Sequence, residues 1–377
     1  MLDHFQDKLS NLKTRHRYRC LEAAAGLDFT SNDYLAFSKA PEIRDALVAS
    51  LADGLPVGAG GSRLLRGNHP AHESLEEQAA RFFGAEATLY FASGYIANFA
   101  ALTTLPQRGD LILFDERMHA SVKEGLHAGH AKSQRLPHND ACAAEDAILA
   151  WRRRGGKGRP WITVESLYSM DGDVAPLADY MTVATRCDAM LMVDEAHATG
   201  VFGAGGKGLT EPFAGRENLI VVHTCGKALG AAGGLICANQ GVIDYLVNHC
   251  RPFIYSTAPA PMMAQAVSAA LTLLEHSPEH QKRLQDLMGF ANRHLTEACG
   301  QPASGSQILP VIIGLDKTAV HLASSLQAQG YDIRAIRPPT VPEGTARLRI
   351  AITLHVTEKD IAEMFQCLAQ NLGDLAA

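Results

Sequence analysis

The 377-residue sequence lacks the features of a membrane-bound or secreted protein. None of its apolar runs approaches the roughly 20 residues that a membrane-spanning helix needs. Charged side chains occur within residues 1–8, where a signal peptide would need an apolar stretch. The eight cysteines are scattered without a Cys-x-x-Cys pair, which argues against a disulfide framework in a chain of this size. We therefore expect a soluble, cytoplasmic protein with reduced thiols and no membrane partner.

Further absences narrow the possible functions. The net charge of -6 argues against nucleic acid as the main partner. No Gly-x-Gly-x-x-Gly lies between a strand pattern and a helix pattern, and no phosphate-loop lysine is followed by Ser or Thr. The pairs His69 with His72 and His127 with His130 lack convincing further ligands, so we expect no metal site.

Six short apolar runs are typical of buried strands. Helical patterns such as residues 177–186 lie between most of these runs, and this alternation predicts a mostly parallel sheet covered by helices on both faces. Periodicity alone does not distinguish such strands from buried helix segments. The six runs are residues 88–91, 111–114, 161–164, 190–193, 219–222 and 234–237.

The pattern differs on either side of this alternating region. The first twelve residues carry apolar side chains at helical spacing, which predicts an amphipathic helix. After about residue 275, longer helical stretches separate two further apolar runs, which is typical of a smaller α+β domain. The sequence thus predicts an α/β protein in three parts: an N-terminal helix and extended segment (1–40), a large domain (41–275) and a small C-terminal α+β domain (276–377).

Polar residues follow several of the predicted strands. Asp194 follows the run at 190–193, and Lys227 comes shortly after the run at 219–222. In open α/β sheets, ligands bind beyond the carboxyl ends of the strands. A lysine there can form a Schiff base with an aromatic aldehyde cofactor, while an acid holds the protonated ring nitrogen. An attraction of about 4 kcal/mol, expected at about 4 Å with an effective dielectric constant near 20, would keep that nitrogen protonated. The pair indicates pyridoxal phosphate (PLP).

Each of these residues also has an ordinary structural interpretation. Ser93 could simply cap a helix, and taken alone the segment favours this over a helix N-terminus that binds a phosphate. Asp194 could be a helix cap or a salt-bridge partner, Lys227 a surface charge, and His197 a structural histidine. The recurrence of polar residues at the ends of strands in one predicted sheet favours a functional site.

The motifs resemble those of the α-oxoamine synthases, a group of fold-type-I PLP enzymes. The resemblance extends from residues 30–35 to residues 347–349 and so covers nearly the whole chain. The sequence departs from the common pattern at Ala36 and Ala59, where glycine and serine are usual. The remaining shared blocks are residues 60–63, 118–121, 169–173, 193–197 and 224–227.

The resemblance implies a role for each candidate residue. Lys227 would be the Schiff-base lysine and proton shuttle, Asp194 would hold the ring nitrogen, and His119 would stack on the ring. The other implied cofactor contacts are Gly94, Tyr95, Ser169, His197 and Thr224, with Ser256 and Thr257 reaching the phosphate of the other subunit of a homodimer. The implied substrate contacts are Arg349 for the amino-acid carboxylate, Asn32, Glu165 and His119 for its orientation, and Arg15 and Thr340 for the acyl group.

The family condenses an amino acid with an acyl thioester and releases carbon dioxide. Residues 335–349 and 137–140 most resemble the members that join L-alanine to a pimeloyl thioester in biotin synthesis. Sister enzymes such as glycine acetyltransferase, 5-aminolevulinate synthase and serine palmitoyltransferase share the PLP residues and remain open as alternatives. A nicotinamide-dependent oxidoreductase and a non-catalytic interaction protein are more distant alternatives.

A basic run at residues 152–159 has two interpretations. It is most simply a solvated loop. It could also be a docking patch for an acidic acyl carrier protein, because charge complementarity speeds encounter. The sequence does not distinguish such a carrier from coenzyme A as the acyl donor.

Overall fold

The structure is a computed structural model that describes residues 2–376, with side chains described as far as residue 374. The chain forms two compact units. The larger unit comprises Leu35–Tyr168 and Val174–Gln281, and the smaller comprises the residues up to Tyr34, Ser169–Asp173 and the residues from Lys282 onward.

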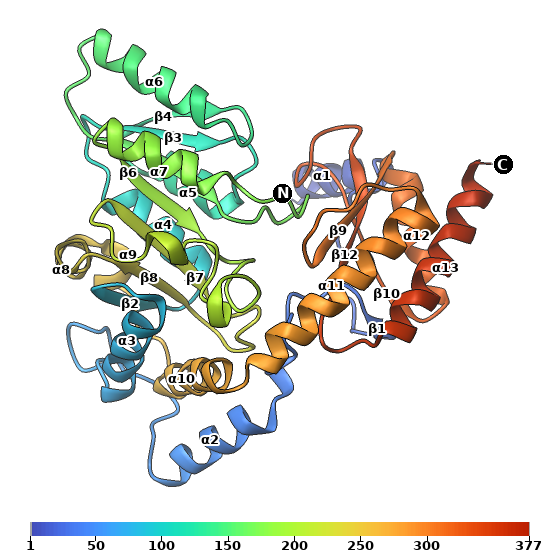
Figure 1. Ribbon diagram of the computed structural model, residues 1–377, viewed down its shortest axis with the longest axis horizontal. Coiled ribbons are helices and arrows are strands. Elements are labelled where there is room, and N and C mark those ends of the chain that lie inside the picture. The colour runs from blue at the N-terminus through green and yellow to red at the C-terminus, as the bar shows by residue number, and fades with distance from the viewer. Residues whose placement is uncertain (1, 377) are drawn as a thin grey trace. The chain divides into compact units, whose positions relative to one another are not determined.

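The larger unit is built around a seven-stranded sheet (Figure 1). Its strands are β2 (Ala87–Phe91), β3 (Leu111–Asp115), β4 (Lys132–Leu136), β5 (Pro160–Glu165), β6 (Met190–Asp194), β7 (Leu219–Thr224) and β8 (Gly234–Ala238). Their order across the sheet is β2-β8-β7-β6-β5-β3-β4. The strands from β7 to β4 run parallel, whereas β8 lies antiparallel to both of its neighbours. The predicted mostly parallel sheet is confirmed, and all six apolar runs are strands.

Helices connect and cover these strands. Their bounds are α2 Pro41–Ala52, α3 Pro70–Phe83, α4 Gly94–Thr104, α5 Ala120–Ala128, α6 Ala141–Arg153, α7 Leu177–Arg186, α8 Gln240–His249, α9 Arg251–Ile254 and α10 Pro261–His276. Helices α3, α4, α7 and α8 pack directly against strands. Helix α4 begins at the end of β2 because the Ser93 hydroxyl accepts a hydrogen bond from the Ile96 N–H at 3.2 Å. The capping interpretation of Ser93 is therefore confirmed, and it places a helix N-terminus at the edge of the sheet.

The smaller unit contains two short sheets. An antiparallel sheet has the order β11-β12-β9, and a parallel pair joins β1 to β10. The strands are β1 (Leu27–Asp28), β9 (Ile308–Gly314), β10 (Tyr331–Asp332), β11 (Arg334–Ile336) and β12 (Ala346–Ala351). The remaining helices of the chain are α1 (Asp3–Thr14), α11 (Pro278–Cys299), α12 (Asp316–Ala328) and α13 (Glu358–Ala376). Strand β1 belongs to the start of the chain, so the N-terminal segment is tied to residues near the C-terminus.

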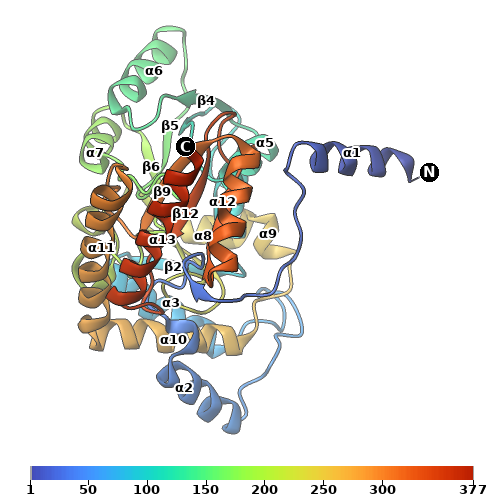
Figure 2. The ribbon, with the colours of Figure 1, turned by 90° about the vertical axis from the view of Figure 1, so that its right-hand side faces the viewer.

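The N-terminal helix forms as predicted, but none of its residues is buried. Figure 2 shows α1 standing clear of the other elements of the smaller unit. The segment between α1 and α2 is extended as a strand only at β1. Among the helices that the structure describes, we find none that combines the length and the apolar character needed to cross a membrane.

Candidate active site

The predicted polar residues of the larger unit meet at one edge of its sheet. In the parallel register, Glu165 pairs with Asp194, and Asp194 pairs with Val222. Gly234, at the start of β8, pairs with both Phe91 and Thr224. The carboxyl ends of β2, β5, β6 and β7 therefore lie along the same edge as the first residue of β8, as expected for the ligand-binding edge of an open sheet.

Asp194 is a buried carboxylate held from both sides. Its exposed fraction is 5%. Oδ1 accepts a hydrogen bond from the Ala196 N–H at 2.9 Å, and Oδ2 accepts one from Asn98 Nδ2 at 2.6 Å. Bonds to an ionised acceptor are stronger than neutral ones, so they fix the orientation of the side chain. The carboxylate has the rigidity required to pair with a cationic ring nitrogen.

Lys227 lies in the turn after β7, next to another predicted site residue. Its Nζ is 3.0 Å from Nε2 of His197. The turn closes where the Gly230 N–H donates to the Lys227 carbonyl at 2.8 Å. Gly230 has a φ of +60°, and a Cβ there would lie 2.2 Å from the Ser38 nitrogen, so glycine is required. Gly230 thus packs tightly on this side of the lysine, whereas a Cβ at Gly226 would make only an ordinary contact, 3.6 Å from the Ala231 carbonyl oxygen.

His119 links the acid and the lysine electrostatically. It is the N-cap residue of α5, and its ring meets that of Tyr95 edge to face at 6.2 Å between centroids. The pKa of His119 lies below its usual value, chiefly because partial burial disfavours the charged imidazolium. The Asp194 carboxylate opposes this effect, whereas Lys227 adds to it. The three residues thus lie within electrostatic reach of one another, and the imidazole is held neutral.

A narrow cradle forms where α4 begins. A Cβ at Gly94 would lie only 2.1 Å from Oγ1 of Thr224, and a Cβ at Gly234 would lie 2.7 Å from the Gly94 nitrogen. The first N–H groups of a helix have no carbonyl partner within the helix. Gly94 and Tyr95 therefore present such N–H groups beside the Thr224 hydroxyl, which is a suitable arrangement for a phosphate. The cradle, the buried acid and the lysine together fit a cofactor that carries a phosphate, a basic ring nitrogen and an aldehyde.

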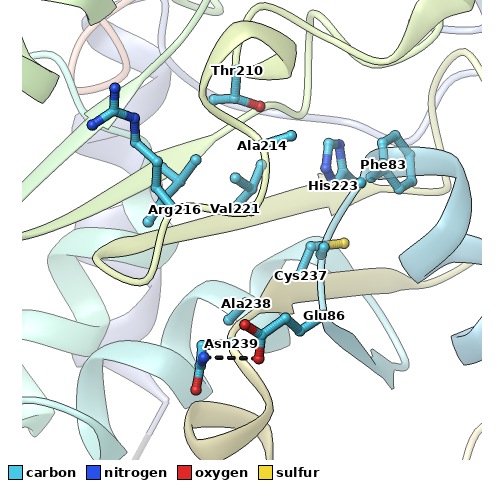
Figure 3. Close-up of a pocket in the computed structure, with 14 residues that line it drawn as sticks. Phe83, Glu86, Thr210, Ala214, Arg216, Val221, His223, Cys237, Ala238 and Asn239 are labelled. Carbon is cyan, nitrogen blue, oxygen red and sulfur yellow. Dashed lines mark hydrogen bonds between the residues drawn. The ribbon is translucent and has the colours of Figure 1, made fainter.

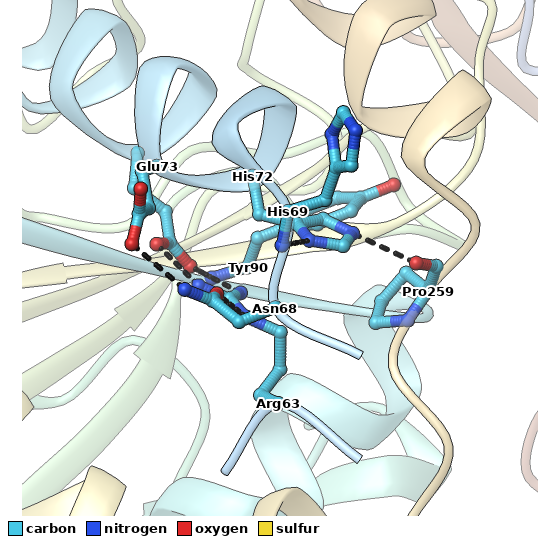
Figure 4. Close-up of polar contacts among 8 residues, drawn as sticks. Arg63, Asn68, His69, His72, Glu73, Tyr90 and Pro259 are labelled. Atoms are coloured by element: carbon cyan, nitrogen blue, oxygen red, sulfur yellow. Dashed lines mark hydrogen bonds and ion pairs between the residues drawn. The ribbon is translucent and has the colours of Figure 1, made fainter. Parts of the chain in front are cut away.

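Ser256 and Thr257 are exposed in the segment between α9 and α10. The segment is anchored where His72 Nε2 donates to the Pro259 carbonyl at 2.8 Å, as Figure 4 shows. Nδ1 of His72 accepts from the His69 N–H at 3.2 Å, which fixes the His72 tautomer. Both histidines cap α3, and His72 also holds this segment.

A second group of predicted residues lies in the smaller unit, where Arg349 is 7% exposed. Its Nε donates to the Ser169 carbonyl at 2.6 Å, and its Nη2 donates to Asn32 Oδ1 at 3.0 Å and to the Tyr34 hydroxyl at 3.4 Å. All three acceptors are neutral. A buried cation without a carboxylate partner is costly unless a ligand neutralises it.

Arg347 lies on the same strand but, unlike Arg349, has a carboxylate partner. It is 4% exposed and forms an ion pair with Asp171. In the part of the chain with described side chains, Arg349 has no such carboxylate. The geometry therefore assigns a structural pair to Arg347 and leaves the Arg349 guanidinium able to bind an anion.

The two residues predicted to contact the acyl group are both exposed. Arg15 follows directly after α1, and Thr340 lines a cavity of about 70 Å³ together with Arg17, Arg19 and Arg337. The sequence interpretation did not include these three arginines. The sequence did carry a signal, because Arg17 and Arg19 lie within four residues of Arg15 and Arg337 lies within residues 335–349.

His223 directly precedes Thr224 but faces elsewhere, because successive side chains of a strand alternate between faces. It is buried, stacks on Phe83 at 3.6 Å between centroids, and contacts Thr199 Oγ1 through Nδ1 at 2.8 Å. Burial lowers its pKa to about 3, so it remains neutral. Figure 3 shows it beside a cavity of about 30 Å³ that none of the predicted site residues lines.

Comparisons with known proteins agree with this arrangement. Residues 24–368 match the family Aminotransferase class I and II. An 8-amino-7-oxononanoate synthase from Chromobacterium violaceum is 40% identical over 358 residues, which is 92% of each chain. The solved 8-amino-7-oxononanoate synthase of Francisella tularensis is 26% identical with a TM-score of 0.79, covering 93% of this chain and 99% of that one.

A structure of SPT (serine palmitoyltransferase) solved with PLP is 25% identical to this chain with a TM-score of 0.89. The match covers 99% of this chain and 98% of that chain. The predicted fold class is thereby confirmed: the chain has the fold of the fold-type-I PLP-dependent transferases. The chain belongs to the aminotransferase class I and II family, in the branch that contains the 8-amino-7-oxononanoate synthases.

Proposed function

We propose that this enzyme binds PLP at Lys227 and catalyses the decarboxylative condensation of L-alanine with a pimeloyl thioester. The products are 8-amino-7-oxononanoate, carbon dioxide and the free thiol carrier. The observation that carries the proposal is the cluster of Lys227, His197, His119 and Asp194 at one edge of the sheet. The relatives named for this reaction support the choice of substrates.

Bound PLP supplies an aldehyde that condenses with amines and a ring that draws electrons away from the substrate Cα. Lys227 would hold the cofactor covalently, and its amine would take the proton from the substrate Cα and return it. Asp194 keeps the ring nitrogen protonated, and neutral His119 covers the ring. Gly94 and Tyr95 donate their N–H groups to the phosphate.

The remaining candidate residues complete the roles. Arg349 binds the amino-acid carboxylate, for which its planar guanidinium suits two parallel hydrogen bonds. The further proposed contacts are Thr224 with the phosphate, Ser169 and His197 with the phenolic oxygen of the ring, Asn32 and Glu165 with the amino acid, and Arg15 and Thr340 with the acyl group.

We also propose that the enzyme acts in the cytoplasm as a homodimer. Ser256 and Thr257 would then contact the phosphate bound by the partner subunit. Their exposure on the single chain supports this role, because side chains that complete another subunit's site must be accessible before assembly. The three domains 1–40, 41–275 and 276–377 are proposed on the sequence pattern alone.

The carrier of the acyl group is a separate question. Arg153, Arg154 and Lys157 are exposed, whereas Arg152 donates to the Gly156 carbonyl at 3.1 Å. The exposed members of the run can attract an acidic carrier protein, and Arg152 shapes the loop.

The proposed reaction is tested by substrate profiling of the purified enzyme. We expect L-alanine with a pimeloyl thioester to be used with a kcat/KM at least about tenfold above that for glycine or for a short acyl thioester, because a methyl or methylene group is worth about 1–3 kcal/mol in a fitted pocket. Parallel assays with coenzyme A and carrier-protein thioesters identify the donor. A preference for glycine would instead assign a sister synthase.

Replacing Gly94 with alanine tests the phosphate cradle. The new Cβ would lie 2.1 Å from Thr224 Oγ1, so the hydroxyl and the start of α4 must separate. We expect the dissociation constant for PLP, measured by titration of the protein freed of cofactor, to rise at least about tenfold. Gly109→Ala is the control, since a Cβ there meets no atom within 4 Å. Equal PLP affinity in the Gly94 variant and wild type would exclude the cradle as the phosphate site.

A further inference from the structure

Hydrogen bonds from the side-chain amide of Asn98 connect Asp194 with His119, the two side chains proposed to contact the cofactor ring. Asn98 lies one turn into α4 and is 2% exposed. Its Nδ2 is 2.6 Å from Asp194 Oδ2 and 3.1 Å from Ser121 Oγ. Ser121 Oγ is in turn 2.8 Å from Nδ1 of His119. A continuous chain of hydrogen bonds therefore runs from β6 through α4 and α5 to the imidazole.

The direction of each hydrogen bond in this chain is fixed by chemistry. A carboxylate only accepts, so the Asn98 atom that faces Asp194 must be the amide nitrogen. The same nitrogen donates its second hydrogen to Ser121 Oγ, which leaves the hydroxyl hydrogen to be donated to His119. The Ser121 N–H also points at His119 Nδ1, at 3.2 Å. Nδ1 is thus an acceptor, and the imidazole proton resides on Nε2.

The amide oxygen of Asn98 shows that stability alone does not explain this residue. Oδ1 is buried and accepts no hydrogen bond from the described residues. Buried acceptors are nearly always paired, and an unpaired one destabilises the folded state. An apolar residue of similar size would avoid this loss. Asn98 thus provides two hydrogen-bond donors at the cost of one buried oxygen without a hydrogen bond from the described residues. Such a departure from full hydrogen bonding in the core is typical of a functional site.

We propose that Asn98 is a positioning residue of the active site. It orients the Asp194 carboxylate toward the cofactor's ring nitrogen and, through Ser121, sets the tautomer and ring plane of His119. The inference depends on the proposed function in that both side chains face PLP. Ser121 acts on one arm only, because the bond between Asn98 and Asp194 does not pass through it.

Asn98→Leu tests the proposal, because leucine keeps the same number and branching of side-chain heavy atoms and removes both donors. We expect the dissociation constant for PLP to rise at least about tenfold, since hydrogen bonds to charged groups contribute about 1.5–3 kcal/mol. The pH midpoint of the visible absorbance change of the loaded protein should shift by about one unit, because the acid no longer holds the ring nitrogen equally well. Asn98→Ala is the second variant if leucine disturbs folding.

Two control variants separate positioning from packing. Ser121→Ala interrupts only the arm toward His119 and leaves the bond between Asn98 and Asp194 in place, so the dissociation constant for PLP should rise less than in Asn98→Leu. The ¹⁵N NMR signals of His119 in the protein freed of cofactor should show Nε2–H in wild type and a smaller excess of that tautomer in this variant, because only the backbone N–H of residue 121 still donates to Nδ1. Asn292→Leu removes another buried amide, 8% exposed, on α11 that donates to the Met288 and Ser306 carbonyls, and it should leave PLP affinity unchanged.

The possible outcomes are distinguishable. Wild-type protein that does not bind PLP would contradict the proposed function. PLP binding by wild type together with unchanged affinity and pH midpoint in Asn98→Leu would overturn the positioning role alone. An Nδ1–H tautomer of His119 in wild type would overturn the direction of the hydrogen-bond chain, whatever the cofactor does.

Discussion

Replacing Lys227 with alanine should abolish turnover and the covalent attachment of the cofactor. The amine is both the point of attachment and the base that takes the Cα proton, and losing a positioned base alone lowers rates by about 10²- to 10⁴-fold. We expect no measurable product above about 10⁻⁴ of the wild-type rate. Reduction of loaded wild type with borohydride should fix the cofactor on the peptide containing Lys227, as read by mass spectrometry.

The matched control for this variant is Lys39→Ala, because Lys39 is an exposed lysine of the larger unit. It should retain wild-type turnover and the same borohydride-fixed peptide. A Lys227→Ala enzyme with wild-type activity, or a fixed cofactor on any other lysine, would overturn the assignment.

The second large effect is expected at Arg349, whose hydrogen-bond acceptors are all neutral. Arg349→Met removes the charge proposed to bind the amino-acid carboxylate. We expect kcat/KM for L-alanine to fall about 10²- to 10³-fold, because loss of one partner from a buried charge pair costs about 2–5 kcal/mol. Arg349→Lys should recover only part of this, since an ammonium cannot form two parallel bonds to a carboxylate.

A stability measurement distinguishes this role from a structural one. Without substrate, Arg349→Met should unfold at or above the wild-type temperature, because an unneutralised buried cation is removed. Arg347→Lys, which preserves the charge opposite Asp171, should leave kcat/KM for alanine near wild type. A variant at Arg349 that is markedly less stable and yet uses alanine normally would assign the residue to the core instead.

The sequence predicted the sheet well where buried strands carry continuous apolar runs. It missed β4, because Lys132–Arg135 are polar and exposed on an edge strand and leave no apolar signal. It also could not show that β8 runs antiparallel, since a buried strand has the same composition in either direction. Strand direction depends on the length and path of the connection.

The candidate site was predictable to the extent that its residues follow strands directly. Asp194 and Thr224 end β6 and β7, so the sequence positions of these strands determine where the side chains lie. The Asn98 contact with Asp194 was not predictable, because it joins a helix to a strand separated by 96 positions. The neutral surroundings of Arg349 were equally hidden, since its partners come from two distant segments, around residues 32–34 and at Ser169.

The pairing of β1 with β10 constrains how the protein can be made. Residues up to Tyr34 are translated before the larger unit, yet their strand partner at Tyr331–Asp332 is translated after it. Nearly all of the larger unit is translated between them, and domains generally fold as units during synthesis. The larger unit can therefore fold while the segment that precedes it is still unpaired, and the smaller unit is completed only after Tyr331 and Asp332 have been translated.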